Sequence, residues 1–308
     1  MRIKLILIYL GVSFLMSCNS YNTFYKITDT SKSISFKKSK RLDLSNTVND
    51  TIYEQLAECS NLHSLNLYNN PDLDLETVFK AIKNPLKLKV LLLNNNSLKE
   101  VPKTIQRFKN LEQLSLNNNA NLNLEMLFET LKHLPIEFLN LQNNKLTSLP
   151  SNITNLKKLK DLNLTSNKIT DNNTFNNLKE LENLESLWLN NNQLKTLPKG
   201  LFKLNNIRNL YIEENQLAVV SEDFLEMDKV WVIHIGNNEL KELPLVFTKM
   251  KNLLLVHANN NKIEYIPAIY GTKKSSVKGL VLDNNNIDVK TKEYLKKQAR
   301  LFFILSLN

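Results

Sequence analysis

The sequence predicts a solenoid of the α/β class, in which short parallel strands stack on one side and short helices or turns line the other. Three observations predict this fold. A leucine motif with one asparagine recurs along most of the chain, its spacing is nearly constant, and several copies continue into Leu-Pro or a similar apolar pair with proline. Repeats of this size are single structural units that bury their apolar side only against their neighbours.

The motif is L-x-x-L-x-L-x-x-N-x-L, with other apolar residues replacing some leucines, and it occurs ten times at intervals of 23 to 26 residues. Clear copies are LKDLNLTSNKI (159–169) and LESLWLNNNQL (184–194). A degenerate first copy, SKRLDLSNTV (39–48), brings the expected number of coils in residues 39–289 to about eleven. The asparagine at the ninth position recurs as Asn70, Asn96, Asn119, Asn144, Asn167, Asn192, Asn215, Asn238, Asn261 and Asn285.

The motif determines the layout of each coil. Successive side chains of a strand point to opposite faces, so the alternating leucines point inward and the residues between them point outward. Similar strands in successive coils pair in parallel, about 4.8 Å apart. The asparagine follows the strand where the chain turns. A buried amide there must bond to backbone groups of neighbouring coils, so we expect a ladder of asparagines.

The convex side is expected to carry short helices and 3₁₀ turns. Pairs such as Leu149-Pro150 and Leu197-Pro198 remove a backbone donor, which excludes a second long sheet. Two longer coils, 73–85 and 122–135, have helical apolar spacing and predict α-helices.

These copies together resemble the leucine-rich repeat family over nearly all of the chain that follows residue 38. The resemblance implies a right-handed, horseshoe-shaped solenoid with a parallel β-sheet on its concave face. It also implies, by analogy of fold, that a ligand binds to this face.

Both ends of a solenoid need caps, because its core is otherwise exposed. Residues 19–38 are expected to form a linker and the start of an N-terminal cap. The cap is expected to extend over 24–60, with a strand-like stretch at 24–36 and a helix around 52–58. Cys59 is expected to be a buried, inert thiol. The C-terminal cap is expected in residues 290–308, as a helix over 291–300 and a terminal strand in LFFILSL (301–307).

Residues 1–18 form a targeting segment. Arg2 and Lys4 precede an apolar run at 5–16 that is too short to span a bilayer and is typical of an export signal. The segment LMSC (15–18) resembles the lipobox of bacterial lipoproteins. The resemblance implies that Cys18 is lipidated and that the protein is anchored in the cell envelope or at the surface. The alternative is a plain secretory signal with an unmodified Cys18.

The formal net charge of +10 is concentrated at the ends of the chain. Residues 21–41 and 271–308 each carry +5, whereas 42–270 carry −2. A nucleic-acid-binding protein has a basic stripe along its working face, so we expect no nucleic-acid partner. The basic residues of 21–41 form either a solvated linker or a contact with anionic lipid head groups.

The sequence contains none of the phosphate-binding or nucleophile motifs, and its five glycines are scattered. His234 and His257 occupy equivalent positions in adjacent coils, but no third ligand is expected beside them. We therefore expect no enzyme activity, no cofactor and no metal site.

The outward positions of the motif predict a binding site on the concave face. The fifth position carries four rings in successive coils, Trp188, Tyr211, His234 and His257, which form a row about 15 Å long. Beside this aromatic row, the second and third positions carry Arg208, Trp231, Leu254 and Leu255. Tryptophan, tyrosine and arginine are enriched in binding hot spots. These eight residues form the predicted concave patch; the alternative is a stack of rings that only stiffens the sheet.

Outward residues of 66–165 are mostly polar and are expected to form a solvated rim. The sequence thus favours an exported, membrane-anchored lipoprotein that recognises a protein partner through its concave patch. One alternative is an envelope-associated structural protein that binds glycan or cell wall, because aromatic rows also stack sugar rings. The other is an intracellular scaffold, if residues 1–18 are not an export signal.

Overall fold

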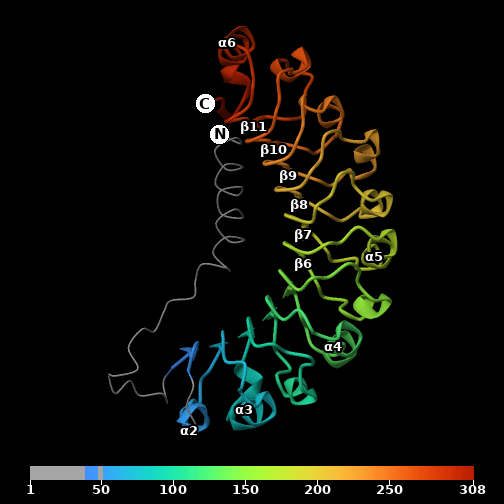
Figure 1. Ribbon diagram of the computed structural model, residues 1–308. Helices are drawn as coiled ribbons and strands as arrows, with labels where there is room; N and C mark the ends of the chain where they lie inside the picture. Colours follow the sequence, from blue (N-terminus) through green and yellow to red (C-terminus); the bar gives the residue numbers. More distant parts are fainter. Residues whose placement is uncertain (1–38, 48–50) are drawn as a thin grey trace.

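The computed structural model describes residues 39–47 and 51–308. Within these residues, twelve strands form one parallel sheet in sequence order. The strands are β1 (Arg41–Asp43), β2 (Ser64–Asn66), β3 (Val90–Leu92), β4 (Gln113–Ser115), β5 (Phe138–Asn140), β6 (Asp161–Asn163), β7 (Ser186–Trp188), β8 (Asn209–Tyr211), β9 (Val232–His234), β10 (Leu255–His257), β11 (Gly279–Val281) and β12 (Ile304–Ser306). Figure 1 shows the coils arranged in an arc, with the strands along the inner, concave side and the helices outside.

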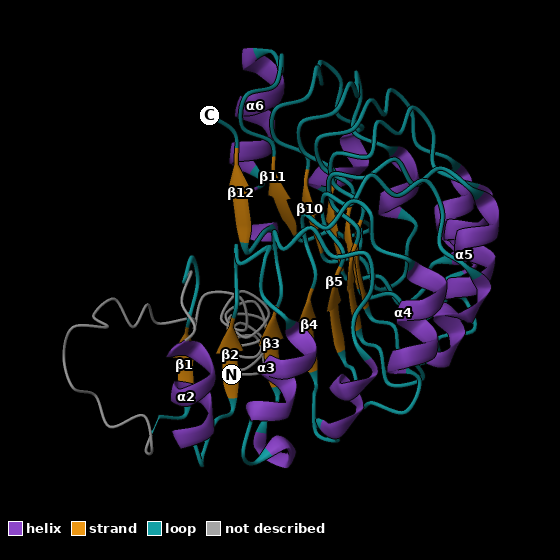
Figure 2. Ribbon diagram, turned by 60° about the horizontal axis from the view of Figure 1, so that its bottom comes forward, coloured by secondary structure: helices purple, strands orange, loops and turns teal. Residues whose placement is uncertain are grey.

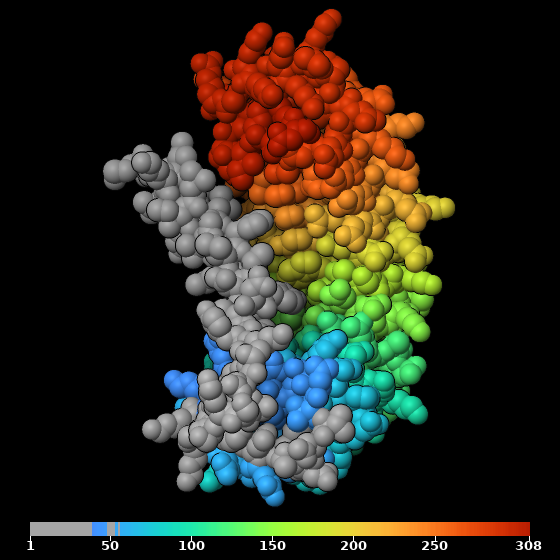
Figure 3. Space-filling model, turned by 60° about the vertical axis from the view of Figure 1, so that its left-hand side comes forward, coloured from blue at the N-terminus to red at the C-terminus, as the bar shows by residue number. Residues whose placement is uncertain are grey.

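The strands pair in the register that the motif predicts. Each strand covers motif positions three to five, and each position pairs with the same position of the next coil, as in Leu187 with Leu210 and Trp188 with Tyr211. The central residue of β2 to β11 is a fully buried Leu, Ile or Val, because it points into the coil. Figure 2 shows the strands side by side along the arc, and Figure 3 shows the coils following one another in order of sequence. The α/β solenoid is therefore confirmed.

The convex side consists of short helices and 3₁₀ turns, as predicted. A 3₁₀ turn begins directly after Pro102, Pro150, Pro198, Pro244 and Pro267. The α-helices of the described residues are α2 (Thr51–Glu58), α3 (Leu75–Ala81), α4 (Leu124–Leu131), α5 (Asn172–Leu178) and α6 (Val289–Lys297). Helices α3 and α4 lie in the two longer coils that the apolar spacing singled out.

Helix α5 was not singled out from the sequence, since NNTFNNL has weak helix propensity and few apolar residues. Its N-terminus is fixed by Asp171, whose carboxylate accepts a hydrogen bond from the backbone N–H of Thr174 at 2.9 Å. Phe175 and Leu178 are buried and hold the helix against the core. The cap and these two contacts explain how a polar segment becomes helical.

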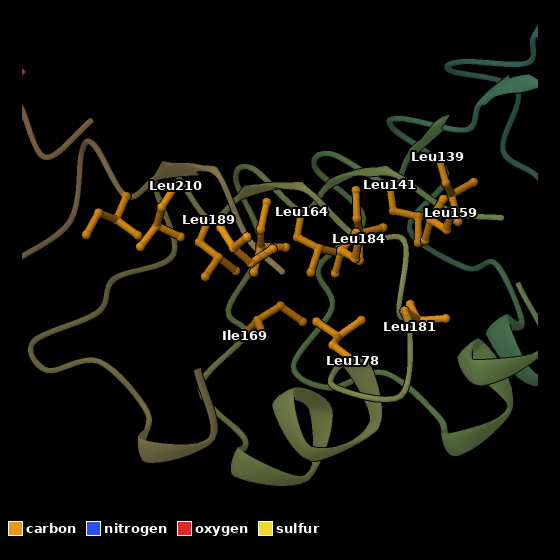
Figure 4. Close-up of a cluster of buried hydrophobic side chains, with 14 of the residues drawn as sticks. Leu139, Leu141, Leu159, Leu164, Ile169, Leu178, Leu181, Leu184, Leu189 and Leu210 are labelled. Atoms are coloured by element: carbon orange, nitrogen blue, oxygen red, sulfur yellow. The ribbon is translucent and has the colours of Figure 1, made fainter. Parts of the chain in front are cut away.

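The core lies between the sheet and the convex helices. In Figure 4, the strand-side leucines Leu139, Leu164 and Leu189 face this space, while Leu178 reaches it from the side of α5. These side chains are at most 1% exposed. One continuous apolar core therefore runs through the stacked coils, as expected for a solenoid.

The ninth-position asparagines form the expected ladder. In its middle, Asn167 donates through Nδ2 to the carbonyl oxygens of Leu141 and Leu164, both at 3.0 Å. Its Oδ1 accepts from the backbone N–H groups of Asn144 and Leu146 of the preceding coil, again at 3.0 Å. One amide thus satisfies four backbone groups where the chain leaves the strand. The first nine asparagines of the set are buried, and Asn285, in the last coil of the set, is only half-buried.

The residue before each ladder asparagine has a positive φ, for example 54° at Asn143 and 53° at Asn191. Asparagine tolerates this left-handed conformation better than other residues with a side chain. It fills this position in most coils, including the degenerate first coil, where Asn46 has a φ of 56°. This turn explains the paired asparagines of the motif and why the repeats need so few glycines.

Helical segments lie at both ends of the described solenoid. Helix α2 and the buried Cys59 lie at the N-terminal end, and burial, with Glu58 nearby, raises the pKa of the thiol to about 11. At the other end, α6 is followed by β12, which adds a last parallel strand to β11. The targeting segment with Cys18, the 19–38 linker and the stretch at 24–36 lie outside the described residues. No helix in the described residues is long and apolar enough to cross a membrane.

Candidate functional site

The aromatic row forms because four rings occupy the same outward position in consecutive strands. Trp188, Tyr211, His234 and His257 end β7, β8, β9 and β10 and pair with one another in register. Their ring centroids are 4.7, 4.4 and 4.3 Å apart in this order, and adjacent planes differ by 6°, 16° and 15°. The strand spacing of about 4.8 Å is thus also the spacing at which flat rings stack.

The two imidazoles of the row are uncharged at neutral pH. His234 is 8% exposed, because Tyr211 and His257 cover its two faces. Burial, with His257 as a second cause, lowers its pKa to about 3, and burial also lowers the pKa of His257. Glu213 lies beside His234, with Oε1 3.9 Å from Nδ1, and burial raises the pKa of its carboxyl group. The row therefore offers aromatic surface without positive charge.

This burial predicts a loss of stability in acid. A histidine with a lowered pKa binds its proton more readily in the unfolded chain, so its contribution falls once the pH drops below about 6.5. For His234, whose folded pKa is about 3, the loss between pH 7 and pH 5 is about 2 kcal/mol. We expect His234→Phe, which keeps a ring but cannot titrate, to lose about 2 kcal/mol less than the unmodified protein over this range. Urea denaturation at both pH values measures the difference; parallel pH profiles would contradict the buried, neutral imidazole.

The second motif position forms a row at the beginning of the strands, and it changes character at Trp231. In earlier coils this row holds charges of both signs that pair across coils, as in Lys89–Glu112 at 2.7 Å and Lys160–Glu137 at 2.9 Å. Arg208 continues the charges, with Nη2 3.6 Å from Glu185 Oε1. Its guanidinium carbon also lies 5.1 Å from the ring centroid of Trp231, within the range of a cation–π contact.

Trp231 is the more exposed of the two tryptophans, with 40% of its surface accessible. Trp188, Tyr211 and His257 are half-buried. Leu255, a predicted patch residue, is 7% exposed and is therefore buried, as His234 is. Five of the eight predicted patch residues are therefore half-buried outward residues (Trp188, Tyr211, His257, Arg208 and Leu254), one is exposed and two are buried.

The apolar surface continues into the C-terminal cap, which the sequence interpretation did not include in the site. Ile304 of β12 pairs with Gly279, which pairs with Leu255. A Cβ atom on Gly279 would lie 2.6 Å from Leu255 Cδ1 and 2.8 Å from Phe303 Cζ, so these two side chains occupy the space above the glycine. Ile304 is 40% exposed. Aligning the tail 301–307 with the motif would have found this extension.

The N-terminal half of the concave face is hollowed rather than a uniform rim. A cavity of about 230 Å³ lies over β3, β4 and β5. Its polar lining comes from the third, fifth and seventh motif positions, and Leu92 and Phe138 add apolar surface. The polar residues are Asn94, Gln113, Ser115, Asn117, Asn140 and Gln142, and we call this cavity the amide hollow.

In residues 39–47 and 51–308, no three His, Cys, Asp or Glu side chains gather closely enough to hold a metal ion. The arrangement of side chains on the concave face is suited to contact with a ligand through rings, amides and apolar groups.

Comparisons with known proteins agree with the repeat. Two leucine-rich repeat models match the sequence, at residues 182–240 and 135–156. No curated protein matches the sequence significantly.

Solved structures share the fold. A chain of the TLR13–ssRNA13 complex is 24% identical, with a TM-score of 0.69 over 87% of this chain and 39% of that one. The internalin InlF of Listeria monocytogenes is 20% identical, with a TM-score of 0.58 over 89% of this chain and 87% of that one. A chain of the Drosophila Toll–Spatzle complex is 18% identical, with a TM-score of 0.59 over 83% of this chain and 39% of that one.

This chain spans about two fifths of the matched TLR13 and Toll chains. The TM-scores show a common fold, and at identities of 24% and 18% the likeness shows the fold alone. The ten copies of the motif, the matching family models and the parallel sheet of stacked coils show that the chain belongs to the leucine-rich repeat family.

Proposed function

We propose that the protein is a non-enzymatic recognition module that binds a protein partner through its concave patch. The observation that carries the proposal is the stack of four rings flanked by the 40% exposed Trp231. Solvated sheet faces ordinarily carry polar side chains, whereas clustered Trp, Tyr and Arg residues are typical of interface hot spots. The ring stack is rigid, so little side-chain entropy is lost when a partner binds.

The electrostatics of the patch favour a protein over a nucleic acid. Arg208 is engaged with Glu185 and Trp231, and the two histidines are neutral. Phosphate contacts require free Lys or Arg side chains, which the patch does not offer. Two matched structures are complexes, TLR13 with the RNA ssRNA13 and Toll with Spatzle. The uncharged aromatic chemistry of this patch suits a protein ligand better than an RNA ligand.

The decisive test is truncation of the two indoles. Trp188→Ala and Trp231→Ala should each weaken partner binding by about 2 kcal/mol, as hot-spot truncations do. The partner is first identified by in-cell crosslinking to the full chain, and its affinity for each purified variant is then measured. The free energy of unfolding should stay nearly unchanged, because neither indole belongs to the buried core.

Asn140→Ala is the control, because it alters the same face two coils away from Trp188. Equal losses at Asn140 and Trp188, or no loss at either tryptophan, would place the binding site elsewhere.

The proposal includes export and anchoring through a lipid on Cys18. Its support is the sequence: a cationic start, an apolar run at 5–16 and the LMSC segment at 15–18. Attached acyl chains at one cysteine provide the two hydrophobic signals that stable anchoring requires. A protein placed in this way would present its concave face outside the cytoplasm.

Cys18→Ser should therefore release the protein from the membrane fraction while leaving it folded. The variant loses the acylated residue but keeps every repeat. Detergent-free fractionation of cells followed by immunoblotting measures the distribution, and circular dichroism of the released protein checks the fold. Complete retention of the variant in the membrane fraction would contradict the lipid anchor.

A further inference from the structure

The amide hollow lies apart from the concave patch. Asn140, in its lining, pairs across the sheet with Asn163, which pairs with Trp188. Two strand spacings, about 10 Å, therefore separate the backbones of the hollow and of the aromatic row. The two surfaces differ in chemistry as well as in position, so they need not serve the same ligand.

The lining of the hollow carries no ionisable side chain. Lys89 and Glu112 of the neighbouring second motif position neutralise each other at 2.7 Å. The carboxyl group of Asp161, which pairs with Phe138 across the sheet, belongs to the next coil and lies outside the lining. An anionic or cationic ligand would find no opposite charge in the lining. The free-energy cost of removing its charge from water would therefore exceed the favourable interactions in the hollow. The hollow therefore selects a neutral ligand.

The amides of the lining are held in place but retain hydrogen-bonding capacity. Asn94 Oδ1 accepts the backbone N–H of Asn117, and Asn140 Oδ1 accepts that of Gln142, both at 3.0 Å. Each of these bonds fixes a side chain and uses one of the two lone pairs on its amide oxygen. Asn117 Oδ1 is buried and accepts no hydrogen bond within the described residues. A hydrogen-bond donor on a ligand would satisfy this oxygen.

The combination of groups matches a sugar ring. Each amide carries both donors and an acceptor, and each sugar hydroxyl can likewise donate and accept. Leu92 and Phe138 offer apolar surface against which the C–H face of a ring can pack. The volume of about 230 Å³ is smaller than the ~300–1,000 Å³ of pockets for drug-sized ligands, so it suits a single ring. We propose that the amide hollow binds one unit of a neutral saccharide, at a site separate from the concave patch.

The experiment measures saccharide binding to the full chain in a detergent without a sugar head group, which would otherwise compete. The probes are glucose, galactose, mannose and N-acetylglucosamine, with their oligomers up to tetrasaccharides, and glucuronic acid as the anionic counterpart. Saturation-transfer NMR detects binding, and calorimetry gives the dissociation constants. We expect at least one neutral saccharide to bind with a millimolar or tighter Kd, and glucuronic acid to bind more weakly.

Matched variants locate the site. Asn140→Ala and Asn117→Leu should each weaken saccharide binding about tenfold, the effect of losing one or two ligand hydrogen bonds. Asn163→Ala is the matched control, since Asn163 holds the same motif position and its Oδ1 accepts the N–H of Thr165 at 2.9 Å. Its effect should stay below about twofold, because it lies outside the lining. Trp188→Ala should also leave saccharide binding unchanged, which separates this proposal from the protein site.

Three results would overturn the proposal: no neutral saccharide bound at millimolar concentrations, an equal loss at Asn163 and Asn140, or a loss at Trp188 without one at Asn140. The last result would mean that sugars stack on the aromatic row instead. Thermal unfolding of each variant accompanies the titrations, so that a loss of binding is counted only for a folded protein.

Discussion

Phe224→Ala is expected to lower the free energy of unfolding by about 4 kcal/mol, within the range for phenylalanine truncation in a core. Phe224 is fully buried on the convex side of the core. Its ring meets those of Phe202 and Phe247 in the adjacent coils edge to face, with centroids 5.2 and 5.4 Å apart. Truncation removes both contacts and leaves a cavity between three coils, which cannot close without moving the stacked strands.

Chemical denaturation followed by circular dichroism measures this loss. Leu225→Ala is the matched control, because Leu225 is the next residue of the same 3₁₀ turn and is 44% exposed. Its truncation should change the free energy of unfolding by less than about 0.5 kcal/mol, as expected for a surface residue. A similar midpoint for Phe224→Ala and Leu225→Ala would show that the coils do not depend on the row of phenylalanines.

Asn167→Ala is expected to lower the free energy of unfolding by about 3 kcal/mol, because it leaves buried backbone groups without partners. The amide bonds to the carbonyl oxygens of Leu141 and Leu164 and to the N–H groups of Asn144 and Leu146, each at 3.0 Å. Within the described residues, only the carbonyl of Leu164 keeps another partner, Nδ2 of Asn192. Alanine can replace none of these bonds. Binding at the concave patch should remain intact, since Asn167 lies where the chain leaves the sheet.

Asn173→Ala provides the comparison for the ladder. Asn173 is an exposed residue of α5, so its replacement by alanine should be neutral or slightly stabilising through helix propensity. Urea midpoints of the two variants separate the buried amide from the exposed one. An unchanged midpoint for Asn167→Ala would mean that water satisfies these backbone groups as well as the side chain does.

Most of the architecture was predictable because the repeat is local. Position two to position nine of one motif cover one strand and one turn, and the same positions in the next coil must lie beside them. The alignment of Trp188 with Tyr211, and of each ladder asparagine with the next, therefore follows from counting along the sequence. The 3₁₀ turns after proline follow from the same local chemistry, since proline fixes φ and removes a donor.

Details that depend on side chains from several coils were not predictable in this way. The sequence could place His234 in the row, but its burial comes from rings on both sides. The polar rim expected at 66–165 contains a hollow, because the sizes of Gln113, Asn117 and Phe138 in three coils together leave a space. Helix α5 depends on the Asp171 cap and on the burial of Phe175, which outweigh a weak propensity.

The sequence by itself determined the coil, its register and the residues that face the concave side, because a period-two strand repeated at near-constant spacing leaves one arrangement of inward and outward positions. Only the tertiary structure decided which outward residues remain reachable and where the surface is hollow. It showed that Phe303 and Leu255 fill the space above Gly279 and that the apolar surface reaches Ile304. Exposure and cavity shape result from the packing of side chains from neighbouring coils. The sequence of a single repeat does not determine them.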